Sequence, residues 1–309
     1  MSECALGTKP NADGSCLLKQ HLVLITHYTG LPTLQKVKQA TDCNTDACVV
    51  QKANIPEEKK EQIKREAFKA PVESNDHSYW LNNTQIDTIM SQLRLRFPGF
   101  AHGFIHMIDL EAFKPTNVNS FDYPVIPAPE TNFPKEIKAG LVKQGVIGGS
   151  LEGQAGDTSL STHNDAPLKS YGIVCNTDSS KGSGQHWFAL YISTDQKDPE
   201  DTSKKMITIE LFNSAGGGTV NEDFNAFWNQ QALAIAKETG LRCVFNDKVT
   251  TIQHQSNETG NCGAYSLFYI YCRLQGVSPE EFNNPQKPVS DYSMQKFRGE
   301  LFKVEEAMF

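Results

Sequence analysis

The sequence contains no apolar run that approaches the roughly 20 residues needed to cross a bilayer, so we expect no membrane-spanning helix. It begins without a charged and then apolar leader, which predicts a protein that is not secreted. Positive charge is in the minority, with 29 lysines and arginines against 36 aspartates and glutamates and a net charge of −7. This balance argues against a broad phosphate-binding surface, so nucleic acid is not expected to be the main ligand.

The chain also lacks a regular cysteine framework, although it contains eight cysteines. In a long chain without a leader, irregular spacing favours reduced thiols over disulfides. Cys43 and Cys48, with Cys16 and His21 upstream, fit no standard zinc spacing. We therefore expect no metal site.

What is present suggests two units. A length of 309 residues allows two domains, or one domain with a substantial extension. Residues 1–75 show helical patterns at 16–27 and 56–68, and we assign them to a mostly helical N-terminal extension. Residues 76–309 form the second unit, which begins close to Trp80. We expect the extension to dock on this second unit and to bind substrate or a scaffold protein.

The second unit combines strand and helix patterns. Strands are expected at residues 171–175, 186–193, 206–212 and 241–245, and helices at 86–93, 134–144, 224–239 and 264–272. Strands grouped between helices predict an α+β fold, with a mixed central sheet flanked by helices.

The most informative segment runs from Gln255 to Cys262. Its polar, turn-forming residues end at Cys262-Gly263, where the apolar helical run over 264–272 begins. A thiol in the first turn of a buried helix lies at the positive end of the helix dipole. We expect this placement to lower the pKa of Cys262 and to make it a nucleophile. Since most such cysteines are ordinary core residues, the assignment depends on partners elsewhere in the chain.

A base and an orienting partner for this thiol stand on two neighbouring strands. His186 begins one strand after a Gly-rich loop, and Asn213 ends the next, so both side chains are expected at one rim of the sheet. The Asn213 carbonyl would accept the Nδ1–H of His186 and leave Nε2 for the Cys262 thiol. Gln255 and the backbone N–H of Cys262 would then stabilise the oxyanion, with the nucleophile at a helix N-terminus.

Other polar residues compete for these roles. His254 is an alternative base, although a histidine on the nucleophile's own loop would have to fold back. Nearby rivals exist for the other two roles: Gln253 or His254 in place of Gln255, and Asp195 or Glu210 in place of Asn213.

The order and spacing of these residues resemble a known family. His186-Trp, then Phe-Asn213-Ser, then Gln255 seven positions before Cys262-Gly are similar to the ubiquitin-like-protein-specific proteases and the adenovirus-type proteinases, clan CE cysteine proteases. The resemblance implies a Cys-His-Asn triad with a glutamine oxyanion donor. It also implies an enzyme that needs no cofactor.

The resemblance continues on both sides of these residues and covers roughly 75–309. Trp80-Leu-Asn-Asn resembles the opening motif of the SUMO-protease domain, and residues 290–302 resemble its closing helix. Cellular SUMO proteases usually have aspartate where this chain has Asn213, and an asparagine there resembles the maturation proteases of large cytoplasmic DNA viruses. This implies a cysteine endopeptidase that processes viral structural or core precursors in the host cytoplasm or the virion.

The resemblance further implies cleavage after a Gly-Gly or Ala-Gly pair held in a narrow tunnel. Tryptophans at the positions of Trp80 and Trp187 line that tunnel, and we expect these two residues and Gly263 to contact substrate. Flat aromatic walls leave room only for residues without side chains, because any Cβ would clash. Both tryptophans could instead be plain core residues. The expected partners are proteins with Gly-Gly-X sites, including viral core or scaffold proteins.

Three other functions remain open. The chain could remove SUMO or another ubiquitin-like protein from conjugates, act as an acetyltransferase as some relatives of this fold do, or serve as an inactive assembly protein. Acetyltransferases of this kind usually carry glutamate at the position of Asn213, which weighs against the second. A Gly-Gly pair in Ile147-Gly-Gly-Ser150 also allows self-cleavage after Gly149, although a flexible loop is the simpler interpretation.

Overall fold

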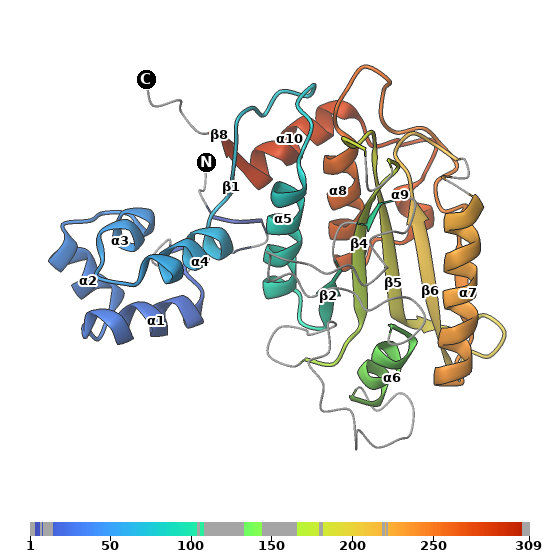
Figure 1. Ribbon diagram of the computed structural model, residues 1–309, viewed down its shortest axis with the longest axis horizontal. Coiled ribbons are helices and arrows are strands. Elements are labelled where there is room, and N and C mark those ends of the chain that lie inside the picture. Colours follow the sequence, from blue (N-terminus) through green and yellow to red (C-terminus); the bar gives the residue numbers. More distant parts are fainter. Residues whose placement is uncertain are drawn as a thin grey trace.

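The computed structural model describes residues 4–6, 8, 15–103, 106–107, 133–143, 166–178, 182–217, 220 and 222–304. Helices and a mixed sheet form a three-layered body, and a separate group of helices lies beside it (Figure 1). Gly149, after which self-cleavage was considered, lies outside the described residues. Within these ranges, no helix is long and apolar enough to cross a membrane.

The N-terminal extension is helical, as predicted. Its helices are α1 (Lys19–Thr29), α2 (Leu34–Thr41), α3 (Asp46–Lys52) and α4 (Glu57–Ala67), which enclose a hydrophobic cluster of their own. Helices α2 and α3 were not predicted from the sequence, although each has a threonine cap. Thr33 accepts a hydrogen bond from the Lys36 N–H, and Thr45 accepts one from the Cys48 N–H. The division at residue 75 stays a prediction.

The prediction of reduced thiols is wrong for the extension. Cys4 is bonded to Cys16, and Cys43 is bonded to Cys48. The prediction used the length of the chain and the start of its sequence. Neither feature indicates which cysteines lie close together in the folded protein. In both pairs folding places the Cα atoms 5.0–5.5 Å apart, within disulfide reach. Three of the four residues weighed as zinc ligands are therefore used in disulfides.

The central sheet is mixed, which confirms the predicted fold class. Its strands are β2 (Phe100–His102), β3 (His106–Met107), β4 (Ser170–Asn176), β5 (Trp187–Lys197), β6 (Lys205–Phe212) and β7 (Cys243–Asn246). They lie in the order β2-β4-β5-β6-β7, and β3 also pairs with β4. Antiparallel pairs join β4 to β5 and β5 to β6, whereas β6 and β7 are parallel because a helix connects them.

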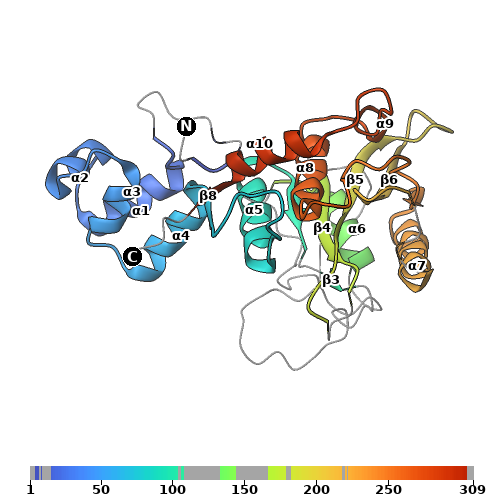
Figure 2. The same cartoon turned by 90° about the horizontal axis from the view of Figure 1, so that it is seen from above.

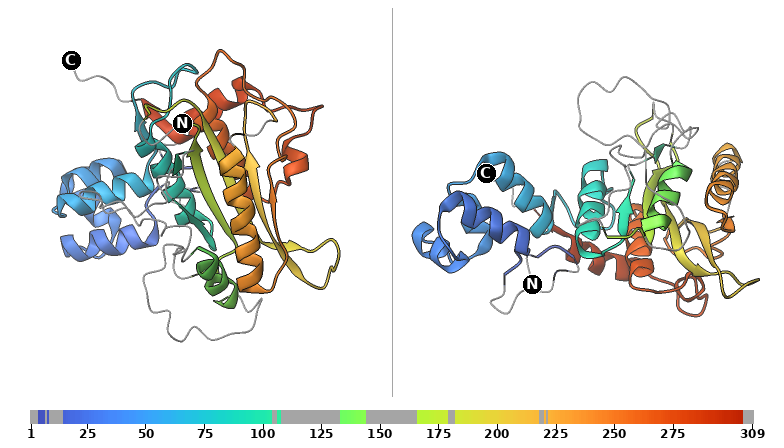
Figure 3. Two further views of the ribbon diagram at one scale, coloured as in Figure 1. Left: turned by 45° about the vertical axis from the view of Figure 1, so that its right-hand side comes forward. Right: turned by 90° about the horizontal axis from the view of Figure 1, so that it is seen from below.

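Helices cover both faces of this sheet. One face carries α5 (Asn83–Arg96) and α8 (Cys262–Leu274), and the other carries α6 (Phe133–Lys143) and α7 (Glu222–Thr239) (Figure 3). Strand β5 supplies both layers, because alternate side chains point to opposite faces. Ala189 and Tyr191 enter the cluster under α8, whereas Phe188 and Leu190 enter the cluster under α7.

The C-terminal part of the chain returns to the N-terminal extension. After α9 (Pro279–Phe282) and α10 (Asp291–Leu301), strand β8 (Phe302–Val304) pairs in parallel with β1 (Ala70–Val72), which follows α4. Seen from above, α10 lies over α8 and points toward the extension (Figure 2). The predicted closing helix at 290–302 is therefore present as α10.

Candidate active site

One pocket brings together residues that are far apart in the sequence. Its lining includes Trp80, His186, Gln255 and Cys262. The rest of the lining is Ala215 and three residues of the loop before Cys262, namely Ser256, Asn257 and Thr259. Asn213 joins this group through a hydrogen bond to His186. Four separate elements thus deliver the predicted site residues to one place.

Cys262 is the first residue of α8. Its N-cap, Asn261, makes no side-chain capping bond, so the N–H groups of the first turn are not used up by a cap. The backbone N–H groups of Trp187, Gly263 and Cys262 act on the thiol. Gly263 lies behind the thiol, where an added Cβ would come 3.2 Å from the Trp187 ring and 3.3 Å from Leu81. Both distances are tighter than ordinary van der Waals contact, so a side chain at this position would require its neighbours to shift.

The expected lowering of the Cys262 pKa is wrong. The thiol is only 1% exposed, and this burial raises its pKa above the usual value. The N–H groups named above and the charge of Arg298 act in the opposite direction but do not outweigh burial. The thiol is therefore neutral at neutral pH and depends on a base to take its proton.

His186 is bonded to Asn213 through the opposite nitrogen to the predicted one. Nε2 of His186 lies 2.8 Å from Oδ1 of Asn213, so the expected Nδ1 bond is wrong. Rotation of the ring exchanges its two nitrogens, and tertiary packing sets that rotation. Oδ1 of Asn213 also accepts the Ala215 N–H at 3.1 Å, which identifies it as the oxygen. Nε2 must therefore donate, and Nδ1 keeps the lone pair that a base needs.

Burial also controls the state of this base. Removal from water lowers the pKa of His186, and the bond to Asn213 opposes that change only in part. His186 is consequently neutral at neutral pH. A neutral imidazole that lines the same pocket as a neutral thiol can accept the thiol proton when substrate arrives.

Gln255 is held by both ends of its amide. Its Oε1 accepts the Ser214 hydroxyl at 2.8 Å, and its Nε2 donates to the Thr259 carbonyl at 2.6 Å. The backbone N–H of Gln255 also donates to the Ser214 carbonyl. Since the primary amide has two N–H bonds, one remains free for the pocket that Gln255 lines. Ser214, which directly follows Asn213, was given no role from the sequence, because its contact with Gln255 depends on the fold.

The two tryptophans occupy different environments. Trp80 is 51% exposed and lines the pocket, so it is not a plain core residue. An added Cβ on Gly260 would lie 2.5 Å from the Trp80 ring, so the nucleophile loop approaches this ring closely. Trp187 is 5% exposed, and its indole N–H donates to the Leu81 carbonyl at 2.9 Å. Trp187 therefore supports the segment that carries Trp80. Whether either tryptophan or Gly263 contacts substrate stays a prediction.

The rival residues point elsewhere. Nε2 of His254 lies 3.0 Å from Oδ1 of Asn283. The carboxylate of Glu210 forms a buried ion pair with Arg273, and Asp195 pairs with a lysine across the β5–β6 hairpin. None of these three rivals belongs to the pocket lining, so the geometry favours His186 and Asn213.

Comparisons with known proteins point to cysteine proteases. Residues 173–309 match the model of the Ulp1 protease family, C-terminal catalytic domain. A cysteine protease of African swine fever virus (isolate Tick/Malawi) is 29% identical over 313 residues, which cover 98% of this chain and 96% of the relative. A relative from the Pig/Kenya isolate, also 29% identical with the same coverage, is named a SUMO-1 cysteine protease.

Solved structures give the same answer for the fold. The crystal structure of the ASFV pS273R protease is 26% identical and superposes with a TM-score of 0.59, covering 98% of this chain and 96% of that one. The matched segment 173–309 contains His186, Asn213, Gln255 and Cys262. The chain is therefore a cysteine protease, and its residues 173–309 match the catalytic domain of the Ulp1 protease family.

Proposed function

We propose that this protease cleaves after Gly-Gly or Ala-Gly pairs in the structural precursors of a virus during virion maturation. In this proposal Cys262 is the nucleophile, His186 is the base, Asn213 orients the base and Gln255 stabilises the oxyanion. The observation that carries the assignment is the 2.8 Å bond from His186 to Asn213 beside the pocket that His186 shares with Cys262 and Gln255. The kinship with proteases of African swine fever virus supports a viral substrate and action in the host cytoplasm or the virion.

The mechanism follows from the positions of the protons. Nδ1 of His186 takes the proton of the Cys262 thiol, and the thiolate attacks the carbonyl carbon of the substrate glycine. The free N–H of Gln255 and the backbone N–H of Cys262 donate to the oxyanion that forms. His186 then protonates the leaving amine, which leaves a thioester on Cys262. Water activated by His186 hydrolyses this thioester and restores the thiol.

Selectivity for glycine is supported by the walls of the pocket. The exposed ring of Trp80 stands beside Cys262, and Gly260 allows the nucleophile loop to approach that ring. A substrate residue that passes between ring and thiol loses space for a side chain. We therefore propose that glycine is selected because larger residues clash.

A panel of peptides tests the proposal. Peptides with internal Gly-Gly-X, Ala-Gly-X and Gly-Ala-X sites are incubated with the full chain, and products are identified by mass. Cleavage of the first two and not the third is expected. Cleavage of the third at a similar rate would contradict the selectivity. Cys262→Ala should be inactive, and Cys272→Ala, a change at a free cysteine on the same helix, serves as the matched control.

A second candidate function is removal of a ubiquitin-like protein from conjugates. It is favoured by the name of the Pig/Kenya relative, a SUMO-1 cysteine protease. A fluorogenic SUMO-tail substrate, assayed beside the folded SUMO conjugate, separates the two functions. Faster cleavage of the folded conjugate than of the short Gly-Gly-X peptide would favour the deconjugase.

A further inference from the structure

One buried arginine contacts the residues that directly precede Trp80 and Cys262 in the sequence. Arg298, on α10, is 0% exposed. Its Nη1 donates to the Tyr79 carbonyl at 2.8 Å and lies 3.4 Å from Oδ1 of Asn261. Tyr79 precedes Trp80, and Asn261 precedes Cys262. A single guanidinium therefore connects the segment that carries the tryptophan wall to the segment that carries the thiol.

Asp291, the first residue of the same helix, binds the loop that precedes Cys262 at three further points. Asp291 accepts from the Asn261 amide at 3.1 Å and from the Thr259 hydroxyl at 2.9 Å through Oδ1. Its Oδ2 accepts the Ser256 N–H at 2.9 Å. Asn261 thus lies between a carboxylate and a guanidinium from one helix. Because Asn261 and Arg298 are both fully buried, this arrangement has little freedom to shift.

The charge of Arg298 is also unusual. Among the described residues it forms no ion pair within 4 Å, and its Nε has no hydrogen-bond partner. Arg273, which lies on α8 and has a side chain that is 8% exposed, is instead neutralised by Glu210 at 2.8 Å. A buried cation without a close anion is costly. Tyr79 and Asp76 favour the charged form of Arg298 most among its neighbours, and an ionised Cys262 would add a further, smaller attraction.

We propose that Arg298 is a positioning residue of this protease, which holds the segments of Trp80 and Cys262 at a fixed separation and stabilises the ionised thiol. The inference rests on the proposed role of Cys262 as the nucleophile. Neither the pocket lining nor the family resemblance singles out this arginine. Its contribution follows from its contacts with both segments and from a buried charge that forms no ion pair within 4 Å among the described residues.

The ionisation of Cys262 can be read directly by alkylation. The rate of iodoacetamide labelling at Cys262 is measured by mass against pH, in a His186→Ala background that removes the neighbouring imidazole. The remaining charged or titratable groups around the thiol and the guanidinium are Asp76 and Tyr79 before α5 and Asp291 on α10. These groups are unchanged in every variant, so differences between curves report on position 298.

Removing the charge should slow labelling. Arg298→Met is expected to shift the curve of labelling rate against pH by about one unit toward higher pH. This shift corresponds to a labelling rate about tenfold lower at neutral pH. Arg298→Lys keeps the charge and should retain the curve of the unsubstituted protein. Arg273→Lys is the matched control at a buried, paired arginine and should also leave the curve unchanged. An Arg298→Met curve that coincides with that of the unsubstituted protein would overturn the electrostatic role.

A second measurement covers the case in which Arg298→Met does not fold. Arg298→Lys cannot make the same contacts with Tyr79 and Asn261, so its kcat/KM for the Gly-Gly-X peptide should fall severalfold at unchanged thermal stability. An unchanged kcat/KM would overturn the positioning role. Failure of the proposed nucleophile would appear differently, as cleavage that persists in Cys262→Ala.

Discussion

The N-terminal extension and the catalytic domain are stabilised by different means. The extension is built from four short helices around a small cluster and contains both disulfides that join described residues. The catalytic domain packs two larger clusters against the faces of its sheet, and its described cysteines are free thiols. The disulfides therefore lie in the region with the smaller hydrophobic core, which has less buried apolar surface to stabilise it. In the domain that carries the pocket, the thiols stay unpaired.

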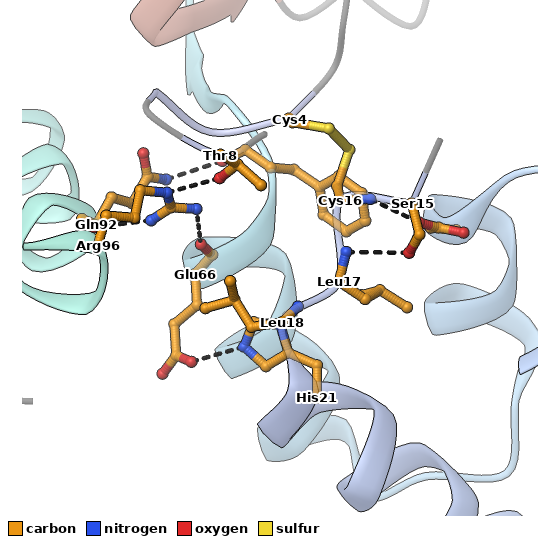
Figure 4. The surroundings of a disulfide bond; sticks show 12 residues. Cys4, Thr8, Ser15, Cys16, Leu17, Leu18, His21, Glu66, Gln92 and Arg96 are labelled. Atoms are coloured by element: carbon orange, nitrogen blue, oxygen red, sulfur yellow. Dashed lines mark hydrogen bonds and ion pairs between the residues drawn. A yellow bond between two sulfur atoms is a disulfide. The ribbon is translucent and has the colours of Figure 1, made fainter. Parts of the chain in front are cut away.

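The junction of the two regions is polar. Figure 4 shows the Cys4–Cys16 disulfide beside Arg96 of α5, whose guanidinium donates to the Thr8 hydroxyl at 2.6 Å and to the Glu66 carbonyl at 2.9 Å. The Gln92 amide donates to two further carbonyls at the end of α4. The disulfide therefore keeps the first residues of the chain within reach of the catalytic domain.

The largest expected difference between the two regions is in the effect of cysteine substitutions on catalysis. Cys262→Ala should lower kcat/KM by about a thousandfold or more, because nucleophile and base act as a unit. Thermal stability should change little. The double change Cys43→Ser with Cys48→Ser should leave kcat/KM close to that of the unsubstituted protein. A large loss in this double variant would show that the extension takes part in catalysis.

Removal of the proposed oxyanion donor should have the next largest effect. Gln255→Ala is expected to reduce kcat by about a hundredfold, since one lost donor in such a site has that order of effect. Gln253→Ala removes a neighbouring amide that does not line the pocket and is the matched control. Equal losses in the two variants would contradict the role of Gln255.

The orienting role of Asn213 predicts a change in pH dependence. Burial lowers the pKa of His186, so activity should fall only when the pH drops below the ordinary histidine range. Asn213→Asp places a negative charge beside Nε2, which favours the protonated ring and raises its pKa. Substantial activity should remain, with the acid limb of the kcat/KM profile shifted upward. An inactive but folded variant would argue against the orienting role.

The disulfides predict a moderate and local effect on stability. Replacing Cys4 and Cys16 by serine opens a link with a sequence separation of 12 and should cost about 2–3 kcal/mol in the extension. Hydrogen exchange should report faster opening of α1 and α4 and little change in β4 to β6. Uniformly faster exchange would mean that the two regions unfold together.

The smallest expected effect concerns acid stability of the extension. Burial raises the pKa of Glu66, but its hydrogen bonds, led by that to His21, outweigh burial and lower the pKa overall. This carboxylate therefore contributes stability above its usual pKa and loses it as the pH falls through the lowered value. Glu66→Gln should flatten the fall of the melting temperature in acid. Glu57→Gln, at an exposed carboxylate of the same helix, should leave the acid profile unchanged.

Much of the catalytic domain could be predicted from periodicity. The strands at 171–175 and 206–212 and the helix at 224–239 appear as β4, β6 and α7, with ends shifted by a few residues. Shorter elements were missed because two or three residues, as in β1, β3 and β8, carry too little pattern. Their existence depends on pairing with partners far away in the sequence.

The sequence by itself determined which residue types are available to the site and in what order they occur. A thiol at a helix start, a histidine and an asparagine at two strand ends, and a glutamine on the same loop are local features. They were sufficient to indicate a cysteine protease, because the ends of adjacent strands lie at one rim of the sheet and bring the histidine and the asparagine together.

Only the tertiary structure decided how these groups behave. Burial raises the Cys262 pKa against the helix dipole, ring rotation presents Nε2 of His186 to Asn213, and proximity joins the cysteines of the extension. It also placed Arg298 against the segments that carry Trp80 and Cys262. Desolvation, side-chain rotation and long-range contact depend on every packed neighbour, and no local pattern in the chain encodes them.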